Sequence, residues 1–216
     1  MHPAPSNVLP ERRKLRHPRE VEVALTEDER VERRAAKARR RGLLLVFTGD
    51  GKGKSTAAFG LALRAAGSRM PVKVIQFIKG AWKSGEREAI RAWVPVIEVE
   101  VGGRGFTIDH LRDPKIETSE HERAARVAWA AAREAVLCGR YRMVVLDEIL
   151  GSITAGLVSE AEVLELAASR PRDLHLVLTG RGATAAIIDA ADLVTEMREV
   201  KHAYQKGILA QRGIEY

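Results

Sequence analysis

The chain has 216 residues and a mass of 23.8 kDa, which fits one medium domain with an appendage and excludes two full domains. It is 45% hydrophobic and 30% charged, which predicts a globular protein, and its single cysteine, Cys138, excludes a disulfide framework and a cysteine-rich metal site. The net charge of +7 suggests a polyanionic partner such as nucleic acid, a membrane surface or a phosphorylated metabolite.

The sequence has no apolar run of the roughly 18 to 20 residues that a membrane-spanning helix needs. The basic residues near the N-terminus are not followed by the hydrophobic stretch of a secretory leader. We therefore expect a cytoplasmic protein that does not contact a membrane.

The basic charge is concentrated at the N-terminus. Residues 1–41 hold 12 Lys and Arg against 7 Asp and Glu, a net +5, so the remaining 175 residues are nearly neutral at +2. We expect a flexible, proline-containing segment over 1–25 and a basic helix within 26–41, running from about Glu27 to Arg40 after a capping box of Thr26 and Glu29. This helix has little apolar surface, so it is expected either to lie across a partner subunit or substrate mouth, or to be a solvated lead-in.

From Gly42 to the C-terminus, short apolar runs alternate with segments of helical periodicity. This alternation predicts an α/β domain, over 42–216, with a mostly parallel sheet flanked by helices. We expect a helix over 55–66 with Gly67 as its C-cap, and two further helices after capping boxes that begin at Ser119 and Ser159. The expected strands are 43–47, 72–78, 96–101, 143–146, 174–178 and 193–197.

A glycine-rich loop follows the first expected strand and precedes the first helix of the domain. Alternate glycines permit left-handed backbone conformations that turn N–H groups inward, and the helix N-terminus adds partial positive charge. In such a loop the lysine contacts phosphate oxygens and the following hydroxyl binds Mg²⁺. The pattern predicts a P-loop NTPase-like (RecA-like) fold with ATP bound by Gly49, Asp50, Gly51, Lys52, Gly53, Lys54, Ser55 and Thr56.

The loop departs at one position from the usual pattern G-x-x-x-x-G-K-[ST]. Thr48 stands where the first glycine belongs, and Gly49 follows it. A displaced hinge glycine is expected to seat a triphosphate differently from motor ATPases and GTPases. Hydrolysis of the γ-phosphate therefore does not follow from the presence of the loop.

Two acids follow the strand expected at 143–146. Because the carboxyl ends of parallel strands meet at one sheet edge, Asp147 and Glu148 are expected to face the phosphate crevice. Hard oxygen ligands suit Mg²⁺ or Mn²⁺, so we predict a metal site made by Ser55, Asp147 and Glu148. The sequence leaves open which acid binds the metal directly, and whether one of them is instead a general base.

Basic side chains elsewhere in the domain are further candidates for phosphate contacts. Arg181 follows the strand expected at 174–178 and should reach the same sheet edge. Arg64 on the first helix of the domain is another ATP-binding candidate, and Lys79 follows the second strand. The sequence does not separate Arg64 or Lys79 from ordinary surface charges.

Eight short segments between Gly42 and the end of the chain form a recognisable set. They are VFTGDGKGKSTAAFG at 46–60, QFIKG at 76–80, GER at 85–87, VVLDE at 144–148, TGRG at 179–182, VKHAY at 200–204, AQ at 210–211 and GIEY at 213–216. In these segments the chain resembles the P-loop-type ATP:corrinoid adenosyltransferases, which act on cob(I)alamin or cob(I)yrinic acid a,c-diamide. The shifted glycine of the phosphate loop is itself a feature of this family.

The resemblance implies transfer of the 5′-deoxyadenosyl group of ATP to the Co(I) centre of a corrinoid, with release of triphosphate. Because the substrate supplies the nucleophile, catalysis is expected to rest on positioning and electrostatics, carried by Lys54 and Glu148 with Mg²⁺ as the cofactor. The resemblance also implies a homodimer in which the N-terminal helix helps to cover the corrinoid. A flavin-type reductase is a candidate partner that would supply Co(I).

The family often has Phe-Thr-Trp in the loop after the third strand, against the corrinoid face. Here that loop reads Phe106-Thr107-Ile108. The resemblance makes Phe106 and Ile108 candidates for an apolar corrinoid-binding wall, with ordinary loop packing as the alternative. The missing indole leaves the corrinoid preference open.

Two other classes of function compete with this one. The main alternative is a P-loop ATPase or switch protein that hydrolyses ATP with Asp147 and Glu148. A nucleic-acid-binding module is disfavoured, because aromatic residues are 5% of the chain and the domain is nearly neutral. Cys138 is expected to be inert packing at a helix end, whereas Trp82 and His202 are expected either near the site or in structural roles.

Overall fold

The computed structural model describes residues 26–28, 30, 32, 40–78, 84–102 and 118–215. The chain divides into two units, Met1–Arg39 and Arg40–Tyr216. In the first unit the described residues Glu27, Asp28, Arg30 and Glu32 are helical, and the Arg30 N–H donates to the Thr26 carbonyl at 3.0 Å. The predicted flexible segment 1–25 lies outside the described residues, as do Glu29, Val31 and residues 33–39 of the predicted helix, and Arg40 is not helical.

A parallel six-stranded sheet forms the centre of the second unit, with the strand order β3-β2-β4-β5-β1-β6. The prediction of six strands in a parallel sheet is confirmed, with strand ends that differ by one or two residues. The strands are β1 (Leu44–Thr48), β2 (Val72–Gln76), β3 (Ile97–Val101), β4 (Met143–Asp147), β5 (His175–Thr179) and β6 (Leu193–Glu196).

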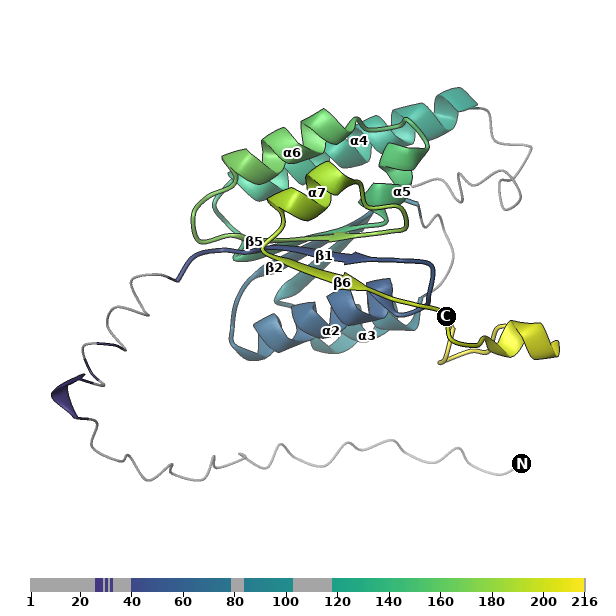
Figure 1. The fold of residues 1–216 in the computed structure, drawn as a ribbon, viewed down its shortest axis with the longest axis horizontal. Coiled ribbons are helices and arrows are strands. Elements are labelled where there is room, and N and C mark those ends of the chain that lie inside the picture. Colours follow the sequence, from purple (N-terminus) through teal and green to yellow (C-terminus); the bar gives the residue numbers. More distant parts are fainter. Residues whose placement is uncertain are drawn as a thin grey trace, which may run out of the picture. The chain divides into compact units, whose positions relative to one another are not determined.

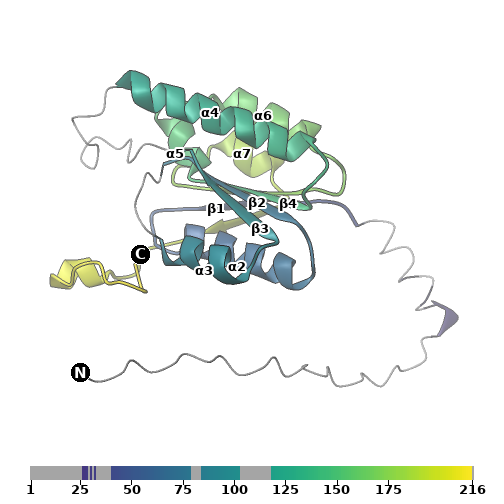
Figure 2. The ribbon, with the colours of Figure 1, turned by 180° about the vertical axis from the view of Figure 1, so that it is seen from behind.

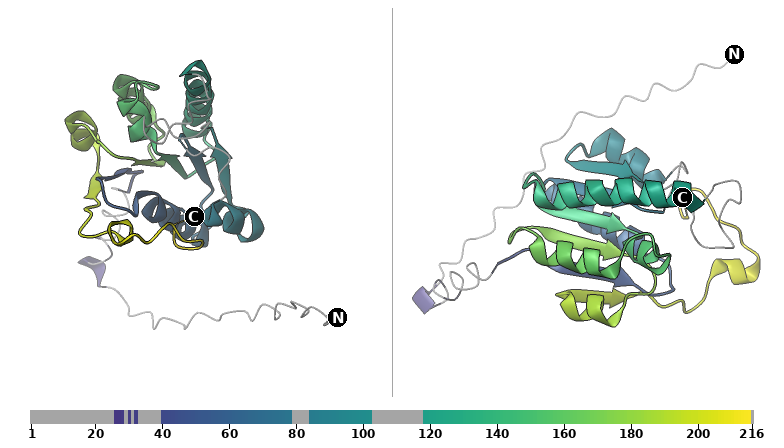
Figure 3. Two further views of the ribbon diagram at one scale, coloured as in Figure 1. Left: turned by 90° about the vertical axis from the view of Figure 1, so that its right-hand side faces the viewer. Right: turned by 90° about the horizontal axis from the view of Figure 1, so that it is seen from above.

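Helices cover both faces of this sheet, which gives the unit three layers (Figures 1 and 2). Figure 3 shows the sheet from its end, between the two helical layers. One face carries α2 (Lys54–Gly67) and α3 (Gly85–Trp93). The other carries α4 (Thr118–Leu137), α5 (Ile149–Thr154), α6 (Glu160–Ser169) and α7 (Ala185–Ala190), and the short helix η1 (Ala203–Lys206) follows β6.

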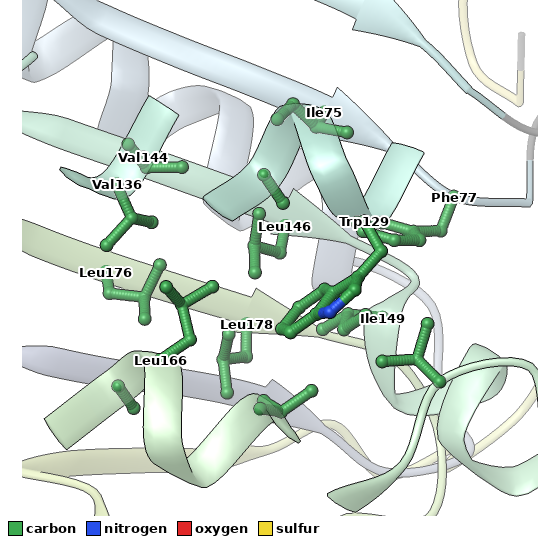
Figure 4. Packing of buried hydrophobic residues seen from close by; sticks show 14 of the residues in the cluster. Ile75, Phe77, Trp129, Val136, Val144, Leu146, Ile149, Leu166, Leu176 and Leu178 are labelled. Carbon is green, nitrogen blue, oxygen red and sulfur yellow. The ribbon is translucent and has the colours of Figure 1, made fainter. Parts of the chain in front are cut away.

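Each face of the sheet has its own hydrophobic core. All five residues of β4 are buried, which explains why the sequence there is an unbroken apolar run. On the side of α4 and α6, Trp129 and Leu166 pack against Leu146 and Leu178 of the central strands (Figure 4). On the side of α2 a second cluster forms around Phe59. These two cores hold the strand ends rigidly in register, which is what a site at the sheet edge requires.

Two of the predicted helix boundaries are wrong. Gly67 is the last helical residue and not the C-cap, because the chain leaves α2 one step later, at Ser68, with Arg69 in the left-handed region at φ 60°. Ser119 lies inside the first turn of α4, since that helix already begins at Thr118. The capping box at Ser159 is confirmed: its hydroxyl accepts from the Glu162 N–H at 3.2 Å, and the Glu162 carboxylate accepts from the Ser159 N–H at 2.9 Å.

The connections leave the carboxyl edge of the sheet in opposite directions. The chain after β1 enters α2 on one face, whereas the chains after β4 and β5 enter α5 and α7 on the other (Figure 1). Because β1 and β5 are neighbours, their loops part at this point, which is where open α/β sheets typically bind ligands. No helix among the described residues is both long enough and apolar enough to cross a membrane.

Candidate active site

Lys54 is the residue directly after the loop of residues 49–53, which joins β1 to α2 at the carboxyl edge of the sheet. Its Nζ donates to the carbonyl oxygens of Gly49 and Gly51, at 2.7 and 2.8 Å, and only 7% of the residue is exposed. Burial lowers the pKa of the Lys54 ammonium, while the nearby carboxylate of Glu148 acts to raise it and the charge of Arg181 to lower it further. The lysine thus caps the carbonyls of its own loop, and a phosphate oxygen could take their place as its partner.

Two glycines of the loop are required by the chain that follows β6. Gly49 has a φ of 96°, and a Cβ atom there would lie 2.5 Å from the Met197 carbonyl oxygen. A Cβ atom on Gly51 would lie 2.6 Å from the carbonyl carbon of Arg198, and the Gly51 N–H donates to the Met197 oxygen at 2.7 Å. The Gly51 amide therefore bonds protein in this loop, contrary to the expectation that successive amides all turn toward a phosphate.

Thr48 occupies the position of the usual first glycine because it is a strand residue. It pairs with Glu196 in the ladder between β1 and β6, and its carbonyl accepts from the Met197 N–H at 2.7 Å. Its Oγ1 accepts from the Ala183 N–H, just after β5, at 3.3 Å. The side chain at position 48 therefore ties β1 to the loop after β5, and the hinge moves to Gly49.

Arg181 lies beside the phosphate loop, at the sheet edge where it was expected. It follows β5, and its Nη2 donates to the Asp50 carbonyl oxygen at 3.4 Å. Gly180 immediately before it has a φ of 139°, and a Cβ atom there would approach Leu150 of α5 to 2.8 Å. A side chain at position 180 would therefore clash with α5 and would also have an unfavourable φ.

The two predicted acids have different environments. Asp147 is fully buried, and its two carboxylate oxygens accept from Thr179 Oγ1 and Gln76 Nε2, each at 2.8 Å. Glu148 is half-buried and adopts a left-handed conformation, with φ 63° and ψ 23°, as the N-cap of α5. A left-handed conformation costs a non-glycine residue about 1 to 2 kcal/mol, so the surrounding structure must hold Glu148 in place.

The remaining predicted site residues fall into two groups. Ser55 is half-buried and Thr56 exposed in the first turn of α2, so both stay beside the loop. Arg64 is in the last turn of α2, ten residues from Lys54 or about 15 Å along the axis, so the structure does not bring it to the loop. Phe106, Ile108, Lys79 and Trp82 lie outside the described residues.

The oxygen donors at this edge suit a magnesium ion that is shared with a nucleotide. Among the described residues no group of three or more His, Cys, Asp and Glu side chains could hold a metal by itself. Asp147 is fully buried, whereas Ser55 and Glu148 are half-buried, so these two are the more accessible oxygen ligands. Mg²⁺ commonly takes one or two protein oxygens and completes its shell with water and substrate phosphates, which fits this donor set.

The C-terminal tail also reaches the phosphate loop. Lys52 forms an ion pair with Glu215. His202 caps η1, where its Nδ1 accepts from the Tyr204 N–H at 3.1 Å, so its observed role is structural. Cys138 is exposed, and the expectation that it packs inside a helix end is wrong because the chain has already left α4 there.

Gln76 and Thr179 were not predicted as site residues, although both are fully buried and bonded to Asp147. Each one is the last residue of a strand that is otherwise largely apolar. A polar residue that ends a buried strand is the signal that would have found them, since a buried polar group needs a partner.

The chain is similar in sequence to known enzymes along most of its length. Residues 40–216 match the family model described as ATP:corrinoid adenosyltransferase BtuR/CobO/CobP. A corrinoid adenosyltransferase of Pseudomonas aeruginosa is 42% identical over 190 residues, covering 86% of this chain and 90% of the relative.

Two further relatives give the same result. The corrinoid adenosyltransferase of Escherichia coli K12 is 40% identical over 189 residues, covering 87% of this chain and 93% of the relative. Corrinoid adenosyltransferase CobA of Salmonella typhimurium is 40% identical over 190 residues, with the same two coverages of 87% and 93%. The chain therefore belongs to the ATP:corrinoid adenosyltransferase family and is a transferase of this type.

Proposed function

We propose that the protein transfers the 5′-deoxyadenosyl group of ATP to the Co(I) centre of a corrinoid and releases intact triphosphate. The electron pair of Co(I) forms the bond to C5′, and the C5′–O bond breaks with its electron pair moving to the triphosphate. The observation that carries this proposal is that three charged residues from separate parts of the chain come together around the phosphate loop. Lys54 and Arg181 donate to carbonyl oxygens of the loop, and the carboxylate of Glu148 acts on the Lys54 ammonium.

The loop residues are suited to hold a leaving group that gains negative charge. Lys54 would exchange the carbonyl oxygens of Gly49 and Gly51 for phosphate oxygens, which are stronger acceptors because they are charged. Arg181 adds a second cation, and Asp50, Gly53, Ser55 and Thr56 line the loop and the helix N-terminus. Fixed positive charge and amide dipoles at a developing anion are among the largest contributions to enzymatic rate.

Ser55 and Glu148 would hold Mg²⁺, or Mn²⁺ in its place, with Asp147 behind them. When bound, the ion neutralises charge on the triphosphate. The chain's own residues supply the other contacts to the triphosphate: the buried Lys54, Arg181 after the neighbouring strand β5, and the loop of residues 49–53. This set positions a polyphosphate and needs no protein nucleophile.

We also propose a cytoplasmic homodimer in which the basic N-terminal segment helps to cover the corrinoid and a reductase supplies Co(I). In the C-terminal tail, Tyr204 is 69% exposed and Leu209 is 74% exposed. Exposed apolar residues of this kind support the proposal that a second protein subunit binds this surface. Phe106 and Ile108 are proposed to contact the corrinoid.

Deletion of residues 1–25 should leave ATP binding unchanged in calorimetry, because the phosphate loop belongs to the second unit.

The direct test is an anaerobic incubation of the protein with reduced cobalamin, Mg²⁺ and ATP. The visible spectrum should show formation of a Co–C bond, and phosphate analysis should recover one triphosphate per bond formed. ADP and orthophosphate without the spectral change would instead identify an ATPase that uses Asp147 and Glu148. Replacing cobalamin by an incomplete corrinoid in the same assay would then define the preferred acceptor.

A further inference from the structure

Three buried polar residues lie side by side at the carboxyl edge of the sheet. Gln76, Asp147 and Thr179 are the last residues of β2, β4 and β5, which are neighbouring strands, and Gln76 pairs with Asp147 in the ladder. The residues two positions earlier, Val74, Val145 and Val177, belong to the core beneath α2. Side chains two residues apart share a face, so this polar row points toward the side of α2, whose N-terminus carries the phosphate loop.

The row holds the Asp147 carboxylate from both sides. Gln76 Nε2 donates to Oδ2 at 2.8 Å, and Thr179 Oγ1 donates to Oδ1 at 2.8 Å. All three residues are 0% exposed, and none of the ion pairs found among the described residues involves Asp147. Each oxygen of this fully buried carboxylate thus accepts a hydrogen bond from a neutral donor, which fixes the orientation of the group.

Thr179 also contacts Glu148, the residue that follows Asp147 in the chain. Its Oγ1 accepts a hydrogen bond from the Glu148 N–H at 2.8 Å, while its own proton goes to Asp147. The Glu148 amide is therefore tied to Asp147 through one hydroxyl. This bond acts on the residue that has the left-handed conformation, with φ 63°, and it helps to hold the sharp turn between β4 and α5.

We infer that Gln76 and Thr179 are positioning residues: they clamp Asp147 so that it orients the turn at Glu148, and Glu148 is the acid that meets the metal–triphosphate. This inference rests on the proposed function and assigns separate roles within the acid pair. Asp147 acts through hydrogen bonds inside the protein. Glu148 lies close enough to Lys54 for its charge to act on the ammonium group of the phosphate loop.

The hydroxyl of Thr179 gives a sharp test, because valine keeps the shape and serine keeps the hydroxyl. In Thr179→Val, binding of Mn²⁺ together with ATP, measured by electron paramagnetic resonance without corrinoid, should weaken about 10- to 100-fold, with a similar loss in kcat. Thr179→Ser should restore both values to within about threefold of the wild type. The matched control is Thr154→Val, which removes a hydroxyl that bonds only the Leu150 carbonyl within α5 and should leave both values unchanged.

Binding of Mn²⁺–ATP and a kcat in Thr179→Val that both match the wild type would overturn the inference, even if the variant were less stable. If Thr179→Val does not fold, Gln76→Met removes the other donor and is judged by the same two measurements; failure of both variants to fold would make the row purely structural. Because binding is measured without corrinoid, the result is independent of the products. If the wild-type protein forms ADP in the transfer assay, the proposed function is refuted. The comparison of Mn²⁺–ATP binding between Thr179→Val and Thr179→Ser would still test the roles inferred for Thr179 and Asp147.

Discussion

The two edges of the parallel sheet are built in opposite ways. At the amino edge, Asp192 accepts from the Leu44 N–H at 2.8 Å and pairs with Arg41 and Arg170, and His175 Nδ1 accepts from the Leu43 N–H at 3.2 Å. Burial acts to raise the pKa of Asp192, but the hydrogen bonds and the two cations outweigh it and leave the pKa below its usual value. These contacts satisfy the N–H groups of Leu43 and Leu44 and pair the charges at this edge.

The carboxyl edge instead holds a buried cation and glycines with no room for a side chain. An added Cβ atom would lie 2.5 Å from the nearest atom at Gly49 and 2.8 Å at Gly180. Lys54 is buried against backbone carbonyls and has a lowered pKa. The amino edge therefore contributes stability through paired charges, whereas the carboxyl edge keeps a cation that a polyanionic ligand can engage.

The largest effect is expected from Lys54→Ala, at the centre of the carboxyl edge. Loss of the ammonium should lower kcat/KM for adenosyl transfer by about two to three orders of magnitude, because Lys54 is the buried cation that would exchange the Gly49 and Gly51 carbonyls for phosphate oxygens. Arg133→Ala, which removes an exposed cation from α4, is the matched control and should keep its activity. Steady-state kinetics in which both variants behaved alike would contradict the role of Lys54.

Gly49→Ala should come next, since it introduces both a clash with Met197 and an unfavourable φ. We expect a loss of about 2 to 3 kcal/mol in the free energy of unfolding, measured with urea, together with weaker ATP binding. Gly60→Ala is the matched control: no atom lies within 4 Å of the added methyl group, and alanine in α2 should stabilise by about 0.5 to 1 kcal/mol. Equal effects of the two substitutions would show that the chain after β6 does not confine the loop.

Asp192→Ala tests the amino edge. It removes the acceptor of the Leu44 N–H and the partner of the largely buried Arg170, so the free energy of unfolding should fall by about 2 kcal/mol while kcat is unchanged. Asp173→Ala, which breaks only the exposed pair with Arg142, should cost less than about 0.5 kcal/mol. A fall in kcat for Asp192→Ala would mean that the two edges are not independent.

The smallest effect, about 1 kcal/mol, is expected from Ser159→Ala at the capping box of α6. Hydrogen bonds from the Ser159 side chain and backbone are the main causes that lower the pKa of Glu162 to about 2. A depressed carboxyl pKa stabilises the fold above the unfolded value near 4.3 and loses that contribution as the pH falls toward 2. The difference in unfolding free energy between wild type and variant should therefore shrink between about pH 4.5 and pH 2; a constant difference would exclude this linkage.

The fold was predictable because its signals are local. Strands such as β4 are apolar from end to end, and the capping box of Ser159 and Glu162 announces α6. The phosphate loop, the acid pair and Arg181 could be placed at one edge because parallel strands share a direction. Arg64 was a candidate for ATP binding because it lies on the helix that follows the phosphate loop. Ten residues of that helix separate it from Lys54, so it lies at the other end of α2.

The α/β class, the parallel sheet, the phosphate loop and the resemblance to corrinoid adenosyltransferases could be read from the amino-acid sequence, since each depends on short-range periodicity or on motif letters. The folded chain was needed to show why Thr48 replaces a glycine, why Gly49 and Gly51 are required and which acid is held by buried hydrogen bonds. The partners that decide these points, Met197, Gln76 and Thr179, lie between 32 and 149 residues away along the chain. The approach of Met197 to the phosphate loop has no local signature. For Gln76 and Thr179 the sequence marks a polar strand end but not its partner, so the packing of the folded chain is needed to reveal both pairings.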